Sequence, residues 1–234
     1  MENRRLKYIG VKDLGNLVTA NFCQRCFWFG RHFGPFPTMF PGIFSVLDSV
    51  SKKSVYRSFF QRKKLPDWLD ISDVIYLPSL EEIGTVLAEY NRKYLIAEHK
   101  KSGWILRGTP DAVFKLRDGT LHIADFKTAR YTAKQDELFP IYEIQLNGYA
   151  LLAHKFTISK LSLVYCEPNS ELKDDTDFKL GFTTKIVPID LKPDVIPGLM
   201  TKAREIVDLK TPPLSKPECR GTCFYIDKIN SKPA

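Results

Sequence analysis

The sequence has no long apolar run and no apolar leader. None of its 234 residues lies in a stretch approaching the about 18 consecutive apolar residues of a membrane helix. The charged start, Met1-Glu2-Asn3-Arg4-Arg5, is not followed by the apolar core of a signal peptide. These absences argue against a membrane-spanning or secreted protein, and we expect an intracellular, cytoplasmic one.

Cysteine is scarce, with five residues in the chain. In a reducing compartment cysteines rarely form disulfides. We therefore expect metal ligands or buried thiols in their place. Cys166 falls within a predicted strand, where a core thiol is expected.

Acidic residues are outnumbered by basic ones. The chain has 35 Lys and Arg but 27 Asp and Glu, so its formal net charge is +8 and its pI is near 9.1. This balance favours an acidic partner, of which nucleic acid is the commonest. The hydrophobic content of 44% is ordinary for a globular protein, and the length suits one domain.

Residues 108–127 form the most informative stretch. Apolar and β-branched residues flank Asp118-Gly119, which predicts two strands joined by a tight turn. Asp125 and Lys127 share one face of the second strand, because side chains alternate with period two.

The length of the turn decides which residue faces Asp125. A two-residue loop would set Asp111 opposite Phe126, on the other face of the hairpin. A three-residue loop with Gly119 in the left-handed conformation would set Asp111 opposite Asp125. We adopt the second register, because it alone gathers two carboxylates and an ammonium group.

Such a trio can hold a divalent cation. Two close carboxylates repel each other unless a cation lies between them. Mg²⁺ or Mn²⁺ prefers carboxylate oxygens, so Asp111 and Asp125 are candidate ligands, with the carbonyl of Phe126 as a third. Lys127 could position a water molecule and stabilise developing negative charge. The alternative is a solvated hairpin with an ordinary Asp/Lys pair, although the apolar setting of Asp125 favours a buried strand.

These motifs resemble those of the PD-(D/E)XK nuclease superfamily. Pro110-Asp111, thirteen intervening residues and Asp125-Phe126-Lys127 carry the likeness, and Gln145-Leu146-Asn147-Gly148-Tyr149 resembles the Gln-x-x-x-Tyr motif of its RecB-like branch. That branch includes CRISPR-associated nucleases with an iron–sulfur cluster.

The resemblance implies an α/β fold with a restriction-endonuclease-like core, in which helices flank a mixed central sheet. It implies Mg²⁺ or Mn²⁺ as cofactor and single- or double-stranded DNA as partner. Gln145 and Tyr149 would lie beside the metal and shape the site. RecB-like nucleases usually carry a further His or Glu ligand on an earlier helix; Glu81, Glu82 and Glu98 are the candidates, and the sequence does not choose between them.

Four cysteines form two pairs near the ends of the chain. Two residues separate Cys23 from Cys26, and three separate Cys219 from Cys223. Four thiolates suit a tetrahedral Zn²⁺ or a [4Fe–4S] cluster. The iron–sulfur nucleases also join their ends with four cysteines, but divide them one early and three late. The metal identity therefore stays open, as does the alternative of two unrelated pairs.

The chain divides into three expected parts of one domain, 1–234. These are a helical cysteine segment at 1–65, a nuclease core at 66–210 and a cysteine tail at 211–234. The hydrophobic periodicity predicts helices over about 11–32, 80–94, 140–154 and 194–209, and further strands over 161–166 and 182–189. A basic segment, 51–64, is either a phosphate-binding surface or a solvated helix face.

Three functions fit the sequence. The first is a Mg²⁺- or Mn²⁺-dependent nuclease acting on DNA in repair, recombination or defence. The second is a catalytically inactive nucleic-acid-binding module of the same fold, and the third is a redox sensor built on the cysteines. Metal-dependent cleavage separates the first two, and the colour of the protein tests the third.

Overall fold

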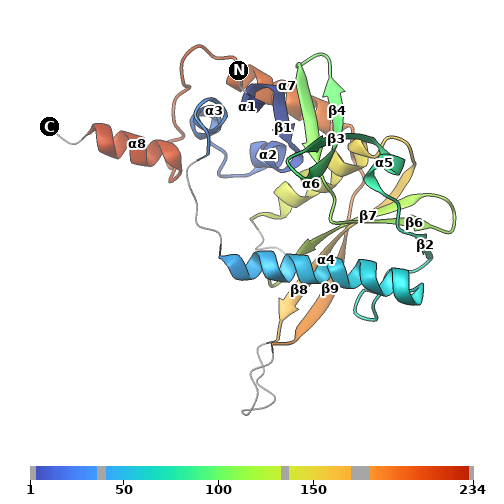
Figure 1. Ribbon diagram of the computed structural model, residues 1–234. Helices are drawn as coiled ribbons and strands as arrows, with labels where there is room; N and C mark the ends of the chain where they lie inside the picture. Colours follow the sequence, from blue (N-terminus) through green and yellow to red (C-terminus); the bar gives the residue numbers. More distant parts are fainter. Residues whose placement is uncertain (1–3, 36–40, 133–136, 170–179, 232–234) are drawn as a thin grey trace.

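The computed structural model describes residues 4–35, 41–132, 137–169 and 180–231. Residues 1–3, 36–40, 133–136, 170–179 and 232–234 lie outside the described residues. The described chain folds into helices and two mixed sheets (Figure 1), which confirms the α/β class. The strands expected from the sequence lie together in the five-stranded sheet, and the four-stranded sheet was not predicted.

The smaller sheet has the strand order β1-β5-β4-β3. Its β1–β5 pair is parallel and the other pairs are antiparallel. The strands are β1 (Tyr8–Gly10), β3 (Thr85–Glu89), β4 (Arg92–His99) and β5 (Trp104–Gly108).

The larger sheet has the order β2-β6-β7-β8-β9 and holds the predicted hairpin. Its β7–β8 pair is parallel, so the chain crosses between these strands through a helix. The strands are β2 (Val74–Tyr76), β6 (Ala112–Leu116), β7 (Leu121–Lys127), β8 (Ile158–Pro168) and β9 (Phe182–Ile189).

The β6–β7 turn has the three-residue form. Leu116 N donates to Thr120 O at 2.9 Å, and Gly119 has a φ of 84°, in the left-handed region open to glycine. The pairing of Ala112 with Ala124 and of Val113 with Ile123 confirms the register adopted from the sequence. Extended by one residue, it places Asp111 opposite Asp125.

The central helix is α6 (Phe139–Leu152), which contacts β4 and β5 of one sheet and β7 and β8 of the other. Pro140 lies in its first turn, where a missing N–H costs nothing. Because both sides of α6 are covered, its sequence is apolar almost throughout. Figure 1 shows it between the two sheets.

The helix expected over 11–32 is wrong as a single element. The chain there forms α2 (Val11–Gly15), a 3₁₀ turn (Asn16–Val18) and α3 (Gln24–His32). A Cβ on Gly148 of α6 would lie 2.6 Å from Val11 Cγ1, so α2 packs against α6 at backbone distance. That close contact turns α2 away from the line of α3.

The helix expected over 80–94 is also wrong. Only α5 (Leu80–Ile83) is helical, and β3 and β4 follow as a hairpin. Tyr90 and Asn91 form its two-residue loop with φ values of 45° and 63°, the signs required by a type I′ turn. The spacing of apolar residues fits a helix, but the Tyr90-Asn91 turn and the pairing of β4 with β5 make the segment a hairpin.

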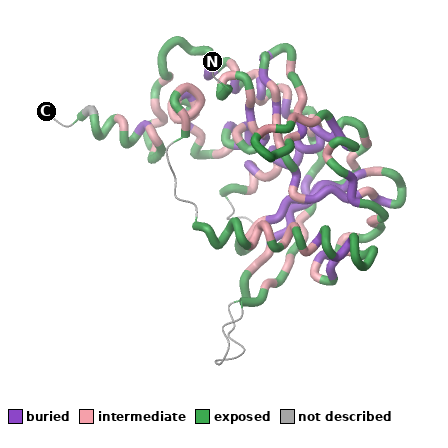
Figure 2. Tube along the Cα trace, in the orientation of Figure 1, coloured by how far each residue is buried: buried purple, intermediate pink, exposed green. Residues whose placement is uncertain are grey.

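The remaining helices are α1 (Arg4–Lys7), α4 (Gly42–Arg62), α7 (Val195–Val207) and α8 (Thr222–Asn230). Of these, α4 contacts the larger sheet, whereas α8 contacts α3 and extends away from both sheets (Figure 1). Val55 and Phe59 of α4 pack in a core cluster with Phe114 and Phe126 of the larger sheet. Figure 2 shows the first turns of α4 exposed beyond that contact. Among the described residues, no helix is long and apolar enough to cross a membrane.

Candidate active site and cysteine centre

The end of β7 brings a buried carboxylate next to an ammonium group. Asp125 is 2% exposed, and its Oδ2 lies 2.5 Å from Lys127 Nζ. The same Oδ2 is buried, and the ammonium group of Lys127 is its close partner. A buried carboxylate held in this way retains capacity for a further cation.

Gln145 of α6 links the carboxylate, the ammonium and a phenol. Its Nε2 donates to Asp125 Oδ1 at 3.0 Å and to Tyr149 Oη at 2.8 Å, while its Oε1 accepts from Lys127 Nζ at 3.3 Å. Gln145 and Tyr149 therefore share one helix face, as their spacing predicts. A Cβ on Gly108 would lie 2.7 Å from Tyr149 Cε1, so glycine lets this ring lie against the end of β5.

Asp111 lies at the start of β6, where both of its oxygens have partners. Its Oδ2 accepts from Phe126 N at 2.9 Å, and its Oδ1 lies 2.6 Å from Lys52 Nζ. The ring of Phe126 packs edge-on against Trp68 on the side of the sheet that faces α4. Asp111 thus reaches the end of the sheet where α4 and α6 both approach.

The electrostatics of the site favour a cation. Burial and then the charge of Asp111 raise the pKa of Asp125 to about 7, against the lowering effect of Lys127 and Lys52. Burial, together with the charge of Asp125, raises the pKa of Tyr149 well above its usual value, so its phenol stays neutral. Two carboxylates that oppose each other's ionisation would both be stabilised by a divalent ion.

Asp48 and Lys52 are site residues that the sequence analysis missed. They lie one turn apart on α4, and Lys52 Nζ is 2.8 Å from Asp48 Oδ2 as well as close to Asp111. Burial opposes the charge of Lys52, but the carboxylates of Asp111 and Asp48 outweigh it and raise its pKa. One feature of the sequence could have pointed to Asp48, which is the sole acidic residue among the 21 residues of α4.

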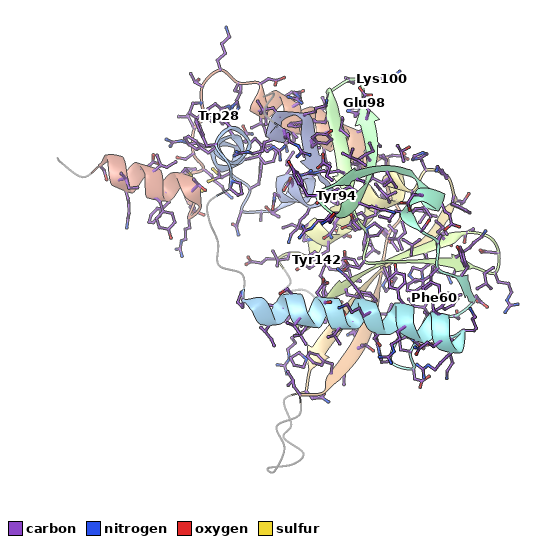
Figure 3. All side chains as sticks on the ribbon, in the orientation of Figure 1. Trp28, Phe60, Tyr94, Glu98, Lys100 and Tyr142 are labelled. Atoms are coloured by element: carbon purple, nitrogen blue, oxygen red, sulfur yellow. The ribbon has the colours of Figure 1, made fainter. Side chains whose placement is uncertain are left out.

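An aromatic ring also borders the site. Lys127 Nζ lies 4.1 Å from the ring centroid of Tyr142, close enough for a cation–π interaction. In the view of Figure 3, Tyr142 lies between α6 and α4. This ring therefore covers one side of the ammonium that Asp125 and Gln145 hold.

The three glutamates considered as further ligands lie elsewhere. Glu81 pairs with Lys93, and Glu82 accepts from Ser79 N at 2.7 Å as a helix cap. Glu98 lies on β4 opposite Ile105, in the smaller sheet, and Figure 3 shows it far from Tyr142. The carboxylate that a helix brings to the site is instead that of Asp48.

The oxygen donors fit a hard divalent cation. Asp111 and Asp125 belong to adjacent strands, and the charge of Asp111 helps to raise the pKa of Asp125. Lysine ammonium groups currently neutralise both carboxylates, which is the role that Mg²⁺ or Mn²⁺ would take. The residues present could hold such an ion.

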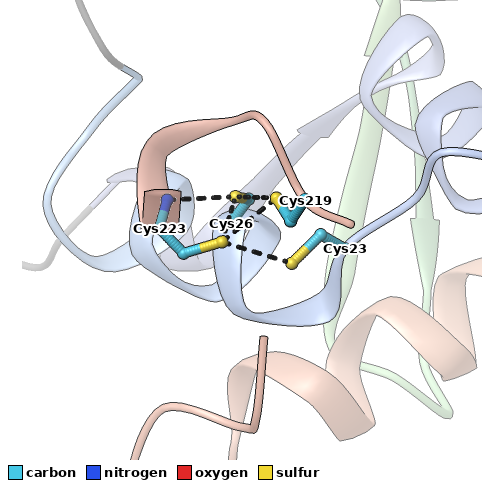
Figure 4. A group of neighbouring side chains, drawn as sticks. All are labelled: Cys23, Cys26, Cys219 and Cys223. Atoms are coloured by element: carbon cyan, nitrogen blue, oxygen red, sulfur yellow. Dashed lines mark hydrogen bonds between the residues drawn. The ribbon is translucent and has the colours of Figure 1, made fainter. Parts of the chain in front are cut away.

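The four terminal cysteines form a second centre (Figure 4). Their Sγ atoms all lie within 4.8 Å of one another. The Cys219–Cys223 pair is 3.1 Å apart, Cys26 lies 3.3 Å from Cys223, and Cys23 lies 3.7 Å from Cys223. The two pairs therefore meet, as expected from their number and type.

Backbone N–H groups shift the pKa values of these thiols. Burial opposes ionisation of Cys23, but the backbone N–H groups of Lys216 and Cys26 outweigh it and lower its pKa to about 7. Burial raises the pKa of Cys26 to about 11, although the backbone N–H of Cys223 opposes the shift. A bound metal would keep all four as thiolates. The donor set suits Zn²⁺ or an iron–sulfur cluster.

Comparisons with known proteins give the family. No curated protein matches the sequence significantly. Among solved structures, the chain is similar to the crystal structure of SSO0001, with 15% sequence identity and a TM-score of 0.41, over 91% of this chain and 79% of that one. The model of the PD-(D/E)XK nuclease superfamily matches residues 48–227, a span that begins at Asp48 and takes in both strands of the hairpin. With most of its length matched, the chain belongs to the PD-(D/E)XK nuclease superfamily.

Proposed function

We propose that this protein is a Mg²⁺- or Mn²⁺-dependent nuclease that hydrolyses phosphodiester bonds of DNA. We place it in the RecB-like branch, with a role in repair, recombination or defence. The observation that carries the proposal is the convergence of Asp111, Asp125 and Lys127 from adjacent strands, within a chain of a nuclease superfamily.

Asp111, Asp125 and the carbonyl of Phe126 are the proposed cation ligands. Asp48 takes the place of the helix-borne His or Glu, since it shares Lys52 with Asp111. When bound, the cation would lower the pKa of a water molecule and neutralise charge on a phosphate.

Lys127, Gln145 and Tyr149 are proposed to act around that water. Lys127 carries the positive charge that stabilises negative charge developing on the phosphate oxygens. Gln145 fixes Lys127 and Asp125 relative to each other, because its amide contacts both. Tyr149 stays neutral and fixes the Gln145 amide. In hydrolysis the water oxygen forms the new bond to phosphorus, and the leaving oxygen takes a proton.

A basic cavity supports DNA as the substrate. A cavity of about 1440 Å³ opens between the cysteine centre and α2. Arg107 in its lining is followed along the chain by Gly108, which contacts Tyr149 at the candidate active site. Phosphates bind to such basic walls with little sequence preference. The basic residues of the lining are Arg5, Arg31, Arg107, Lys216 and Arg220.

The cysteine centre is proposed to hold a structural metal, either a [4Fe–4S] cluster or Zn²⁺. It joins residues 23–26 to residues 219–223, and therefore ties the N-terminal segment to the tail of a single domain spanning 1–234. Its role is proposed to be structural, because the four thiols come from segments near the two ends of the chain and lie together.

The pKa of Asp125 predicts how cation binding depends on pH. The carboxyl must lose its proton to bind a cation, and its pKa is raised to about 7. Below pH 7 the apparent affinity for Mn²⁺ should therefore fall, by roughly tenfold per pH unit. Calorimetric titration between pH 5.5 and 8 measures the slope. An affinity that stays constant down to pH 5.5 would contradict the assignment of Asp125 as a ligand.

The proposed function is tested with labelled single- and double-stranded DNA. Purified protein should cleave DNA with Mg²⁺ or Mn²⁺ and not with EDTA. The variant Asp111→Asn, which keeps the size of the side chain but removes its charge, should bind DNA without cleaving it. Binding without metal-dependent cleavage by the unmodified protein would instead favour a catalytically inactive nucleic-acid-binding module.

A further inference from the structure

Lys52 occupies an unusual position for a lysine of a basic helix. Its ammonium group lies 2.6 Å from Asp111 Oδ1 and 2.8 Å from Asp48 Oδ2, and its side chain is 31% exposed. The next residue, Lys53, is exposed on another side of α4. Lys52 is therefore directed into the candidate site, while the side chain of Lys53 is exposed to solvent.

We propose that Lys52 is a built-in counter-ion that competes with the divalent cation for the carboxylates of Asp48 and Asp111. This inference rests on the proposed metal-dependent function. Without a divalent ion, the ammonium group holds the two carboxylates together. When the ion binds, Lys52 must leave Asp111, and its charge becomes available to the phosphate of a substrate.

The charge balance of the site supports this competition. Asp48, Asp111 and Asp125 contribute three carboxylates when ionised, and Lys52 and Lys127 contribute two ammonium groups. One negative charge then remains for an incoming cation. Removal of Lys52 would leave two, and would also remove a like charge from the neighbourhood of the ion.

The two lysines of the site have different contacts, and these leave Lys52 as the one that can move. Lys127 contacts Asp125, the Gln145 amide and the Tyr142 ring on the side of α6. Lys52 belongs to a part of α4 that precedes its core contacts at Val55 and Phe59, and its ammonium group lies at ion-pair distance from the carboxylates of Asp48 and Asp111. Lys52 is thus a positioning residue, which sets how strongly the site binds its ion.

The test measures binding of Mn²⁺ directly. Calorimetric titrations with Mn²⁺ at pH 8 compare the unmodified full chain with the variants Lys52→Met and Lys52→Gln. Both substitutions remove the charge of the side chain but keep much of its length. Both should bind Mn²⁺ with a dissociation constant about tenfold lower than that of the unmodified protein. The matched control is Lys53→Met, which makes the same change in net charge one residue away and should bind Mn²⁺ as the unmodified protein does.

Thermal unfolding gives a second readout. Without Mn²⁺, Lys52→Met should unfold at a lower temperature, because Asp48 and Asp111 then repel each other. Added Mn²⁺ should raise its unfolding temperature more than that of the unmodified protein. If the unmodified protein binds Mn²⁺ and both Lys52 variants bind it equally or more weakly, the counter-ion role is overturned. If none of the proteins binds Mn²⁺, the proposed metal-dependent function fails as well.

Discussion

Replacement of Lys127 with alanine is expected to abolish DNA cleavage while the protein still folds. The ammonium group of Lys127 lies 2.5 Å from Asp125 Oδ2 and is the nearest positive charge that β7 offers to a phosphate. Loss of one preorganised group that stabilises charge in a transition state costs about 10² to 10³ in rate. Here the loss of rate should be larger, because removal of Lys127 also favours the protonated form of Asp125, a proposed cation ligand.

The Lys127→Ala substitution has a second effect, on the pKa of Asp125. Lys127 lowers this pKa, but burial and the charge of Asp111 outweigh it, so that the pKa is raised to about 7. Without Lys127 the carboxyl should remain protonated at neutral pH, since a buried carboxylate without a partner is costly. Protonation protects the fold from a buried unpaired charge, but it removes a cation ligand. The variant should therefore be stable and should bind Mn²⁺ more weakly.

Cleavage of labelled DNA with Mn²⁺ measures the loss, and circular dichroism reports the fold. Lys185→Ala is the matched control, because Lys185 lies on β9 of the same sheet, also 4.1 Å from a tyrosine ring, that of Tyr131. The control should cleave DNA normally. Full activity of purified Lys127→Ala would defeat the role assigned to Lys127.

Replacement of Cys23 with serine is expected to remove the metal of the cysteine centre and to lower stability strongly. Cys23 is buried, and its thiol meets that of Cys223 from the opposite end of the chain. Structural thiolate-bound Zn²⁺ contributes on the order of 10 kcal/mol in small domains. Whole proteins are stable by about 5–15 kcal/mol. Loss of the centre should therefore detach the tail or unfold the protein.

Two measurements test the prediction for Cys23→Ser, one of its metal content and one of its stability. Elemental analysis gives the zinc and iron content, and absorbance near about 400 nm distinguishes an iron–sulfur cluster from a colourless zinc site. Thermal unfolding gives the change in stability. Cys166→Ser is the control, because Cys166 lies on β8, apart from the four-cysteine group. Unchanged metal content and unfolding temperature in Cys23→Ser would show that the cysteines hold no structural metal.

Local rules explain which elements could be predicted. The β6–β7 register follows from a three-residue turn around Gly119, and α6 follows from Pro140 in its first turn and the mostly apolar residues after it. The segment 80–94 failed because its apolar spacing suits a helix, whereas the Tyr90-Asn91 turn and the partner strand β5 decide for a hairpin. The break between α2 and α3 also depends on a distant element, α6.

The sequence by itself determined the hairpin, because a turn and an alternating strand are encoded by neighbouring residues. It left two turn lengths open, and the structure decided for the one that sets Asp111 opposite Asp125. The sequence also determined the superfamily, through motifs with fixed spacing. Only the tertiary structure decided that Asp48 and Lys52 reach Asp111, and that cysteines about two hundred positions apart meet. Those contacts depend on how α4 lies across the larger sheet and how the tail returns to α3. Such long-range packing is set by the whole core and leaves no periodic signal in the sequence.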